Sequence, residues 1–270
     1  MKILNNIIDL KKAIKRIPDL GFVPTMGGLH RGHISLITTS KKKCKKTLIS
    51  IYINPKQFNK IKDFNSYPRN LLQDIKLLKK LKVDFVFIPQ TSDIYRNKEK
   101  KINLDNVDKI LCAKFRKGHF EGVLDIMNRF IKIITPKYVF LGKKDYQQFF
   151  LIKKYFNSTY KKTIIYPCKT IRDKNFIALS TRNLLLNKKD LNKASLIANF
   201  LFKFKEDFKK KNKKSSNTKE IKKYLMNKFK VKFDYLEIRN DKDLSFDFKK
   251  NNLRLFVAYY INKIRLIDNF

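Results

Sequence analysis

The stretch VPTMGGLHRGHISLI, residues 23–37, decides the fold expected for this chain. A short apolar strand over 21–24 leads into a turn with two adjacent glycines, Gly27 and Gly28, and a helix over about 32–40 follows. A strand, a glycine turn and a helix in this order expose backbone N–H groups and a positive helix end to an anion. The glycine spacing differs from that of the G-x-x-x-x-G-K-[ST] phosphate loop, and the lysine of that loop is absent.

Two histidines in this stretch, His30 and His33, form an H-x-G-H motif at the start of the helix. Their imidazoles can lie on one side of the helix, and Gly32 permits a close approach to the backbone. There they can donate hydrogen bonds to phosphate oxygens as negative charge builds up in a transition state. Zinc ligation is the alternative, but no nearby cysteine or carboxylate completes a tetrahedral set.

Strands and helices alternate along the first 170 residues. The expected strands are 21–24, 47–53, 83–88, 138–141 and 163–166, and the expected helices are 32–40, 70–81, 121–134 and 145–156. One face of an N-terminal helix is expected to carry Ile3, Ile7, Leu10, Ile14 and Ile17. The alternation predicts an α/β fold with a Rossmann-like parallel sheet that is covered by helices on both faces.

The character of the sequence changes after about residue 171. Residues 188–214 read as a very basic helix, and the run 203–219 reads as a solvated helix and loop. Strand-like segments follow at 235–238, 253–260 and 263–267. We therefore expect two domains, 1–170 and 171–270, of which the second is a smaller α+β domain.

The 270 residues carry 63 Lys+Arg against 23 Asp+Glu, which gives a formal net charge of +40. The charge is spread evenly, with +25 on residues 1–170 and +15 on 171–270, and all but 11 of the basic residues are lysines. Recognition of phosphates and bases often favours arginine instead. We therefore expect a lysine-rich surface without a specific nucleic-acid partner.

Hydropathy and cysteine usage indicate which general class of protein this chain belongs to. No apolar run approaches the ~18 residues of a membrane span, so no membrane association is expected. The three cysteines, Cys44, Cys112 and Cys168, lie far apart without a C-x-x-C pair, which favours a reduced, cytoplasmic protein. A hydrophobic content of 43% argues against a disordered chain.

Further blocks accompany the H-x-G-H stretch in order along the chain. They are SIYINPKQF (50–58), YPRN (67–70), VDFVFIP (83–89), FRKGHFEGV (115–123), VFLGKKDYQQFFLI (139–152) and TIRDKNFIALSTRN (170–183). Together they resemble the pantothenate synthetase (pantoate–β-alanine ligase) family, a relative of the nucleotidyltransferases and class I aminoacyl-tRNA synthetases. The resemblance covers about residues 20–185.

The resemblance implies an ATP-dependent ligase that acts in two steps. Pantoate attacks the α-phosphorus of Mg-ATP to give pantoyl adenylate and pyrophosphate, and β-alanine then converts the adenylate to pantothenate and AMP. The resemblance also implies a homodimer formed through the N-terminal domain, nucleotide and pantoate binding by residues 1–170, and a lid-like domain at 171–270. Metal ligands for Mg²⁺ are not singled out by the sequence.

Polar side chains after the expected strands suit a hydroxy acid such as pantoate. Asn54 and Gln57 follow the strand over 47–53, where open parallel sheets bind their ligands. Gln57 and Gln148 are neutral groups that both donate and accept hydrogen bonds. The resemblance implies that both glutamines contact pantoate, that Gln57 also lies near β-alanine, and that Asn54 and Arg116 line the same cleft.

The resemblance also assigns the residues that handle ATP. It makes His33 a proton donor and places His30, Lys144 and Arg182 beside it in catalysis, with Arg182 suited to bidentate phosphate binding. The implied ATP-binding residues are Met26, Gly27, Gly28, Leu29, His30, Arg31, Gly32, His33, Gly142, Lys143, Lys144, Asp145, Ile171, Leu179, Ser180, Thr181 and Arg182.

Three positions depart from the family pattern. Lys143 replaces a usual glutamate and reverses a charge near the cleft. Phe176 stands where a glycine is usual, so its loop is expected to take a conformation that a bulky residue allows. Leu179 replaces a usual methionine, which conserves volume.

Two other functions stay open. One is a nucleotidyltransferase that uses the H-x-G-H motif to release an adenylylated product, against which the NPKQF and GKKDYQQ blocks count. The other is a basic nucleic-acid-binding protein without catalysis, against which the even charge distribution counts.

Overall fold

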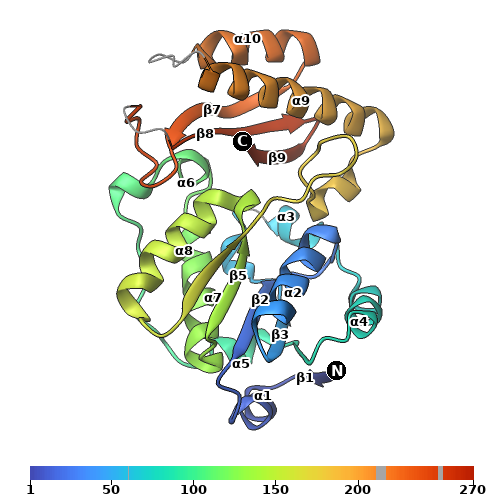
Figure 1. Ribbon diagram of the computed structural model, residues 1–270, viewed down its shortest axis with the longest axis vertical. Helices are drawn as coiled ribbons and strands as arrows, with labels where there is room; N and C mark the ends of the chain where they lie inside the picture. The colour runs from blue at the N-terminus through green and yellow to red at the C-terminus, as the bar shows by residue number, and fades with distance from the viewer. Residues whose placement is uncertain (60, 211–216, 249–251) are drawn as a thin grey trace. The chain divides into compact units, whose positions relative to one another are not determined.

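The computed structural model describes residues 1–59, 61–210, 217–248 and 252–270. Its first unit, Met1–Thr170, contains a six-stranded parallel sheet (Figure 1). The strands lie in the order β1 (Lys2–Leu4), β4 (Phe85–Phe87), β3 (Lys46–Ile51), β2 (Leu20–Thr25), β5 (Tyr138–Gly142) and β6 (Ile164–Cys168). β2 and β3 pair along their whole lengths and are almost entirely buried, so both read as apolar runs. The predicted parallel α/β sheet is confirmed.

Helices cover both faces of this sheet. On one face, α2 (Arg31–Lys43) and α4 (Leu71–Lys80) bury Leu36, Ile37 and Leu78 against strand residues that include Val23 and Ile49. On the other face lies α7 (His119–Ile134), whose Phe130 ring is 5.5 Å from Phe22 and 6.3 Å from Phe87. α8 (Tyr146–Thr159) contacts α7 as well as β5 and β6.

Short helices, including 3₁₀ helices labelled η, complete the first unit, and the sequence predicted few of them. They are α1 (Ile7–Ile14), η1 (Pro55–Gln57), α3 (Ile61–Asn65), α5 (Thr91–Ile94), η2 (Asn106–Asp108), α6 (Leu111–Phe115) and η3 (Lys143–Asp145). The prediction that Ile3 and Ile17 share a helix face was wrong. Asn6 caps the start of α1 by accepting a hydrogen bond from the Asp9 N–H at 2.8 Å, so Ile3 lies before the helix, in β1. The helix ends at Ile14, so Ile17 lies beyond it.

The order of the strands places the ligand crevice of the first unit. From the central strand β2 the chain proceeds to β3 and β4 on one side, and it later returns to β5 and β6 on the other side. Open parallel sheets bind ligands at the carboxyl ends of the strands, at the point where the strand order reverses. Residues 26–33 after β2 and 143–145 after β5 lie at that point.

The second unit, Ile171–Phe270, contains the antiparallel sheet β7 (Lys232–Asn240), β8 (Leu253–Ile261) and β9 (Ile264–Asn269). α9 (Lys188–Lys210) and α10 (Thr218–Phe229) bury Ile197, Leu201 and Leu225 against this sheet, and η4 (Thr181–Leu185) precedes them. The predicted smaller α+β region is confirmed, although α10 was not predicted. Residues 211–214 of the predicted basic helix, and 211–216 of the predicted solvated run, lie outside the described residues.

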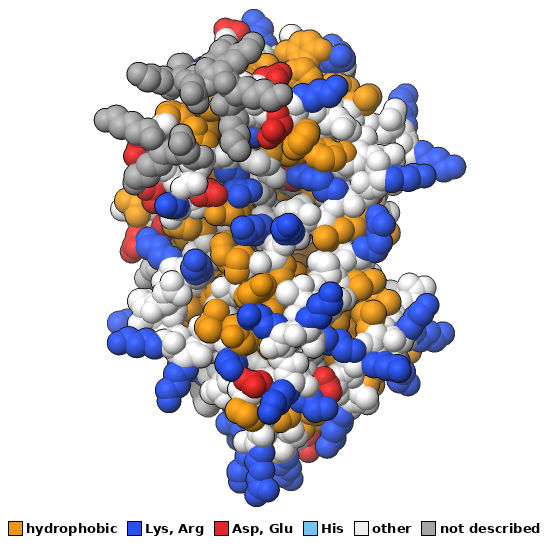
Figure 2. All heavy atoms as spheres, viewed as in Figure 1, with side chains coloured by type: hydrophobic (Ala, Val, Ile, Leu, Met, Phe, Trp, Pro, Cys, Tyr) orange, Lys and Arg blue, Asp and Glu red, His pale blue; other side chains and the backbone are white. Residues whose placement is uncertain are grey.

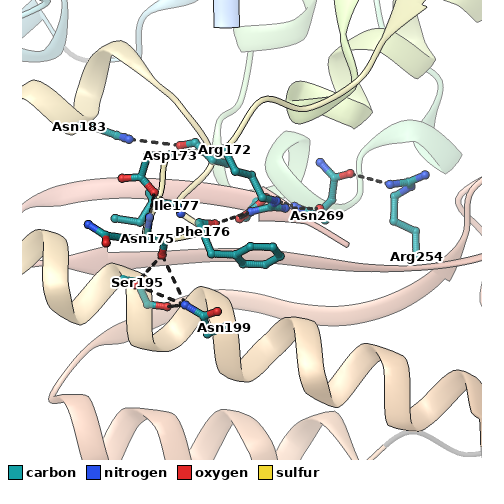
Figure 3. A network of polar contacts seen from close by, with 12 residues as sticks. Arg172, Asp173, Asn175, Phe176, Ile177, Asn183, Ser195, Asn199, Arg254 and Asn269 are labelled. Carbon is teal, nitrogen blue, oxygen red and sulfur yellow. Dashed lines mark hydrogen bonds and ion pairs between the residues drawn. The ribbon is translucent and has the colours of Figure 1, made fainter. Parts of the chain in front are cut away.

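Phe176 contradicts the expectation that its loop takes a conformation suited to a bulky residue. Its φ is +69°, in the left-handed region that favours glycine. The Arg172 guanidinium lies 4.6 Å from the Phe176 ring and 4.6 Å from the Phe270 ring, and it donates two hydrogen bonds to the Asp268 carboxylate. Arg172 also donates to the Phe176 carbonyl at 3.0 Å (Figure 3). These contacts of the ring and backbone offset the strain.

The strain at Phe176 predicts an order of stability among its variants. Phe176→Ala and Phe176→Gly both lose the ring contacts, but only glycine also removes the left-handed strain. We therefore expect Phe176→Ala to be less stable than Phe176→Gly by about 1 kcal/mol. Thermal unfolding of the full chain measures the order, and an alanine variant that melts higher than the glycine variant would contradict it.

Three further observations bear on the class of protein. In the part of the chain that the structure describes, no helix is long and apolar enough to cross a membrane. The thiols of Cys44, Cys112 and Cys168 are free and buried. On the face drawn in Figure 2, lysine and arginine side chains are scattered among polar and apolar ones.

Candidate active site

The glycine turn after β2 uses its own N–H groups internally. The Gly27 N–H donates to Thr25 Oγ1 at 3.3 Å, and the Gly28 and Leu29 N–H groups donate to the two oxygens of the Asp74 carboxylate at 2.8 Å each. The expectation that this turn offers these N–H groups to an anion was therefore wrong. Gly27 and Gly28 have φ values of +76° and +62°, so the turn needs glycine for its backbone conformation.

Asp74 is a residue that sequence reasoning missed. It lies on α4 with only 4% of its surface exposed, although a carboxylate is rarely buried without partners. The signal was available, because Asp74 lies one helical turn before the fully buried Leu78, on the apolar face of the predicted helix. A carboxylate on that face indicates a buried partner, which the structure identifies as the glycine turn.

His30 and His33 cap the start of α2 reciprocally. The Gly32 N–H donates to His30 Nδ1 at 3.0 Å, and the His30 N–H donates to His33 Nδ1 at 3.2 Å. Because Nδ1 accepts in both rings, each neutral imidazole carries its proton on Nε2. The ring centroids are 4.1 Å apart, and Arg31 between them is exposed. The motif therefore presents two Nε2–H donors.

Both imidazoles are neutral at neutral pH. Burial, followed by the positive charge of Lys144, lowers the pKa of His30 to about 4. Burial, followed by the neighbouring His30, lowers the pKa of His33 to about 3. In the free protein His33 is therefore neutral, and its Nε2–H can donate a hydrogen bond.

The lowered pKa of His33 predicts that stability falls below about pH 6. The unfolded chain binds a proton near the ordinary pKa of 6.5, whereas folded His33 stays neutral down to about pH 3. Between these values the unfolded state binds more protons, so the free energy of unfolding decreases as the pH falls, by about 1–2 kcal/mol from pH 7 to pH 5 for this residue. Denaturant unfolding at both pH values measures the loss. His33→Asn, which has no titrating ring here, should lose less, and equal losses in the two proteins would contradict the assignment.

The segment after β5 lies beside the histidines. The charges of Lys144 and Asp145 both act on the pKa of His30 and of His33, and Lys144 Nζ lies 3.2 Å from Asp145 Oδ1. This segment is η3, which follows Gly142 directly and includes Lys143. Gln148 is partly exposed in the first turn of α8, which follows η3. The structure thus brings the predicted lysine to the H-x-G-H motif.

Asn54 after β3 does not point its amide at a substrate. The residue is 1% exposed. Its side chain donates to the Gly122 carbonyl at 2.9 Å and accepts hydrogen bonds from the Tyr95 hydroxyl at 2.9 Å and the Lys56 N–H at 3.2 Å. All of these contacts hold the turn in place. Asn54 therefore shapes the turn that carries Gln57, instead of lining the cleft as expected.

Gln57 joins the ends of β2 and β3. Its Nε2 lies 2.7 Å from Met26 Sδ, so the two predicted residues meet at the carboxyl edge of the sheet. Its backbone carbonyl lies 2.6 Å from Nδ1 of His119, and His119 Nε2 lies 2.8 Å from Nη1 of Arg116. The predicted Arg116 and Gln57 are thus joined through a histidine to which the sequence assigned no role.

The remaining predicted residues belong to the second unit. The Leu179 N–H donates to the Ile171 carbonyl at 2.9 Å, and the Arg182 N–H donates to Ser180 Oγ at 3.3 Å. Thr181 is 5% exposed at the start of η4. Ile171, Leu179 and Ser180 therefore lie in the segment that precedes η4, and Thr181 and Arg182 begin η4.

Candidate metal ligands do not cluster in the part of the chain that the structure describes. In those ranges no group of three or more His, Cys, Asp or Glu side chains could hold a metal ion. The Nδ1 atoms of His30 and His33 are occupied as hydrogen-bond acceptors. The arrangement suits binding and stabilisation of a phosphate-bearing substrate by neutral donors and one lysine.

Comparisons with known proteins agree with this chemistry. Residues 2–270 match the family model of pantoate-beta-alanine ligase. A pantothenate synthetase from Clostridium botulinum is 37% identical over 277 residues, which cover 100% of this chain and 99% of the relative. Another from Pseudothermotoga lettingae is 36% identical and covers 100% and 98%.

Solved structures give the same result. The pantoate-beta-alanine ligase of Francisella tularensis, complexed with beta-gamma ATP and beta-alanine, has a TM-score of 0.85 and 36% identity, covering 100% of this chain and 97% of that one. A pantothenate synthetase from Thermus thermophilus has a TM-score of 0.90 and 27% identity, covering 100% and 99%. The chain belongs to the pantoate–beta-alanine ligase family.

Proposed function

We propose that this chain condenses pantoate with β-alanine, using ATP, through a pantoyl-adenylate intermediate, and releases AMP and pyrophosphate. As a member of its family it is an AMP-forming ligase. The observation that supports the residue roles is the group of neutral His30 and His33, Lys144 and Gln57 at the carboxyl ends of neighbouring strands. Pantoate and nucleotide bind to residues 1–170, and residues 171–270 act as a lid-like domain.

In the first step, an oxygen of the pantoate carboxylate attacks the α-phosphorus of ATP. The P–O bond to the β-phosphate breaks, and its electron pair leaves with pyrophosphate. Negative charge grows on the phosphate oxygens, where the Nε2–H groups of His30 and His33 and the Lys144 ammonium stabilise it. Neutral imidazoles provide these hydrogen bonds without exchanging a proton.

In the second step, the amine of β-alanine attacks the acyl carbon of the adenylate. The C–O bond to AMP breaks, the electron pair leaves with AMP, and the proton lost by the nitrogen passes to water. Gln57 and Gln148 orient the hydroxy acid through hydrogen bonds, Gln57 also faces β-alanine, and Arg116 lines the same cleft. Asn54 contributes by holding the turn that carries Gln57.

The remaining ATP contacts come from two loops. Residues 26–33 and 142–145 of the first unit bind the nucleotide, and the 171–182 loop of the second unit supplies Ser180, Thr181 and Arg182 to the phosphates. Arg182 is suited to bidentate contact with a phosphate. Ile171 and Leu179 pair with each other and provide apolar contact for the nucleoside.

Mg²⁺ enters as part of the Mg-ATP substrate. Mg²⁺ retains waters and usually needs only one or two carboxylates besides phosphate oxygens. The Asp145 side chain is 47% exposed beside Lys144, so it fits an outer contact of such an ion. Bound to ATP, the ion would neutralise phosphate charge.

The setting of the enzyme follows from the same proposal. We place the reaction in the cytoplasm, with no membrane or specific nucleic-acid partner, and assign a homodimer formed through residues 1–170. Sedimentation of the purified chain tests the dimer, and a monomer at micromolar concentration would refute it.

One assay tests the function. Exchange of labelled pyrophosphate into ATP should require pantoate, and addition of β-alanine should then release AMP together with pantothenate. Exchange without pantoate would refute the proposal. AMP release that does not respond to β-alanine would instead indicate a nucleotidyltransferase.

A further inference from the structure

The turn after β3 lies against the first turns of α7. The Gly122 carbonyl accepts from the Asn54 amide at 2.9 Å, and Lys56 Nζ is 3.4 Å from Asp125 Oδ2. A Cβ added at Gly122 would lie 2.4 Å from the Lys56 carbonyl oxygen, so the two backbones are in close contact. The position of α7 therefore determines the position of the turn that carries Gln57.

His119, the first residue of α7, contacts both Gln57 and Arg116. The residue is 7% exposed, and its ring has Nδ1 2.6 Å from the Gln57 carbonyl oxygen and Nε2 2.8 Å from Arg116 Nη1. A carbonyl can only accept a hydrogen bond and a guanidinium can only donate one. His119 Nδ1 must therefore carry the proton, and Nε2 must accept from Arg116. This tautomer is opposite to that of His30 and His33.

We propose that His119 is a positioning residue, which fixes Gln57 and Arg116 at the substrate cleft through its Nδ1–H tautomer. The inference rests on the proposed function for the roles of Gln57 and Arg116, whereas the tautomer rests on geometry alone. One rigid ring sets the spacing between the backbone of the first residue and the guanidinium of the second. Misplacement of either group weakens orientation of the substrate before any bond changes.

Two substitutions separate the two halves of this role. In His119→Asn the amide nitrogen replaces Nδ1 and can still donate to Gln57, but the acceptor for Arg116 is lost. In His119→Gln the amide oxygen can replace Nε2 as the acceptor for Arg116, but the donor to Gln57 is lost. His119→Phe keeps the ring volume and loses both contacts, and it serves as the matched control.

The Michaelis constants of the two substrates then distinguish the variants. His119→Asn should raise KM for pantoate about tenfold with KM for β-alanine unchanged, because only Arg116 is released. His119→Gln should raise both constants, because Gln57 contacts both substrates, and His119→Phe should raise both further. Unchanged constants in all three variants, with only a lower melting temperature, would overturn the proposal.

Nitrogen NMR of the wild-type chain tests the tautomer without any activity. The chain has only three histidines, so the ¹⁵N-imidazole spectrum is simple. Two rings should carry the proton on Nε2 and one on Nδ1, and His119→Asn should remove the latter signal. A His119 signal protonated on Nε2 would overturn the proposal even if the enzyme makes pantothenate. A wild-type chain that makes no pantothenate but shows the expected signals would refute the proposed function alone.

Discussion

Replacement of His33 by asparagine is expected to slow pantoate-dependent pyrophosphate exchange about 10²- to 10³-fold, with little loss of stability at pH 7. The Asn side-chain oxygen replaces Nδ1 and can accept from the His30 N–H, so the cap of α2 is preserved. What is lost is the Nε2–H donor to the phosphate oxygens. Exchange kinetics and thermal unfolding of the same preparation measure the two effects.

His33→Gln provides the reciprocal comparison. Its amide nitrogen can replace Nε2, but the acceptor for the His30 N–H is lost. This variant should retain more exchange activity than His33→Asn and have lower stability, because a capping bond contributes about 1 kcal/mol. The reverse order of activities would show that the ring acts through Nδ1 or as an acid, which contradicts the assigned tautomer.

Replacement of Asp74 by asparagine is expected to lower both stability and exchange activity. The carboxylate accepts from the Gly28 and Leu29 N–H groups at 2.8 Å each, and the asparagine amide would place an NH₂ group against one of them. Loss of a charged acceptor at a buried site costs about 2–3 kcal/mol. The turn would relax, and the adjacent H-x-G-H motif would move with it. Urea unfolding and pyrophosphate exchange report the two losses.

Asp84→Asn is the matched control for Asp74→Asn. The Asp84 carboxylate also accepts a backbone hydrogen bond, from the Thr47 N–H at 2.9 Å, and it forms an ion pair with Lys46 at 2.8 Å. It lies at the amino ends of β3 and β4, away from the carboxyl ends that carry the site. The Asp84→Asn variant should be less stable than the wild-type chain but should retain the pyrophosphate exchange rate of the folded enzyme. If both variants retain that rate, Asp74 has no part in positioning the motif.

Much of the fold could be predicted from the sequence for a physical reason. β2 and β3 are buried on both faces, so they are apolar runs that end at turn residues. α3, α5 and α6 span four or five residues, which is too short for a helical period to be seen. β1 is only three residues long, and the spacing of its Ile3 also fits the helical pattern that follows, so the sequence predicts a helix there.

The site could be predicted by residue type but not by orientation. The histidines, glutamines and Lys144 follow strands, where the fold brings ligand contacts together. The direction of Asn54 depends on Gly122, 68 positions away, and the glycine turn depends on Asp74, 46 positions from Gly28. Local spacing can indicate that a carboxylate such as Asp74 has a buried partner, but it does not identify a partner so far away in the sequence.

The fate of the pantoate carboxylate oxygens tests the adenylate most directly. The enzyme is supplied with ATP, β-alanine and pantoate in which both carboxylate oxygens are ¹⁸O. The ¹⁸O content of the products is then measured by mass spectrometry. The proposed reaction predicts AMP with one ¹⁸O in its phosphate and pantothenate with one ¹⁸O in its amide carbonyl. Unlabelled AMP, with the ¹⁸O found in inorganic phosphate, would contradict activation by adenylation.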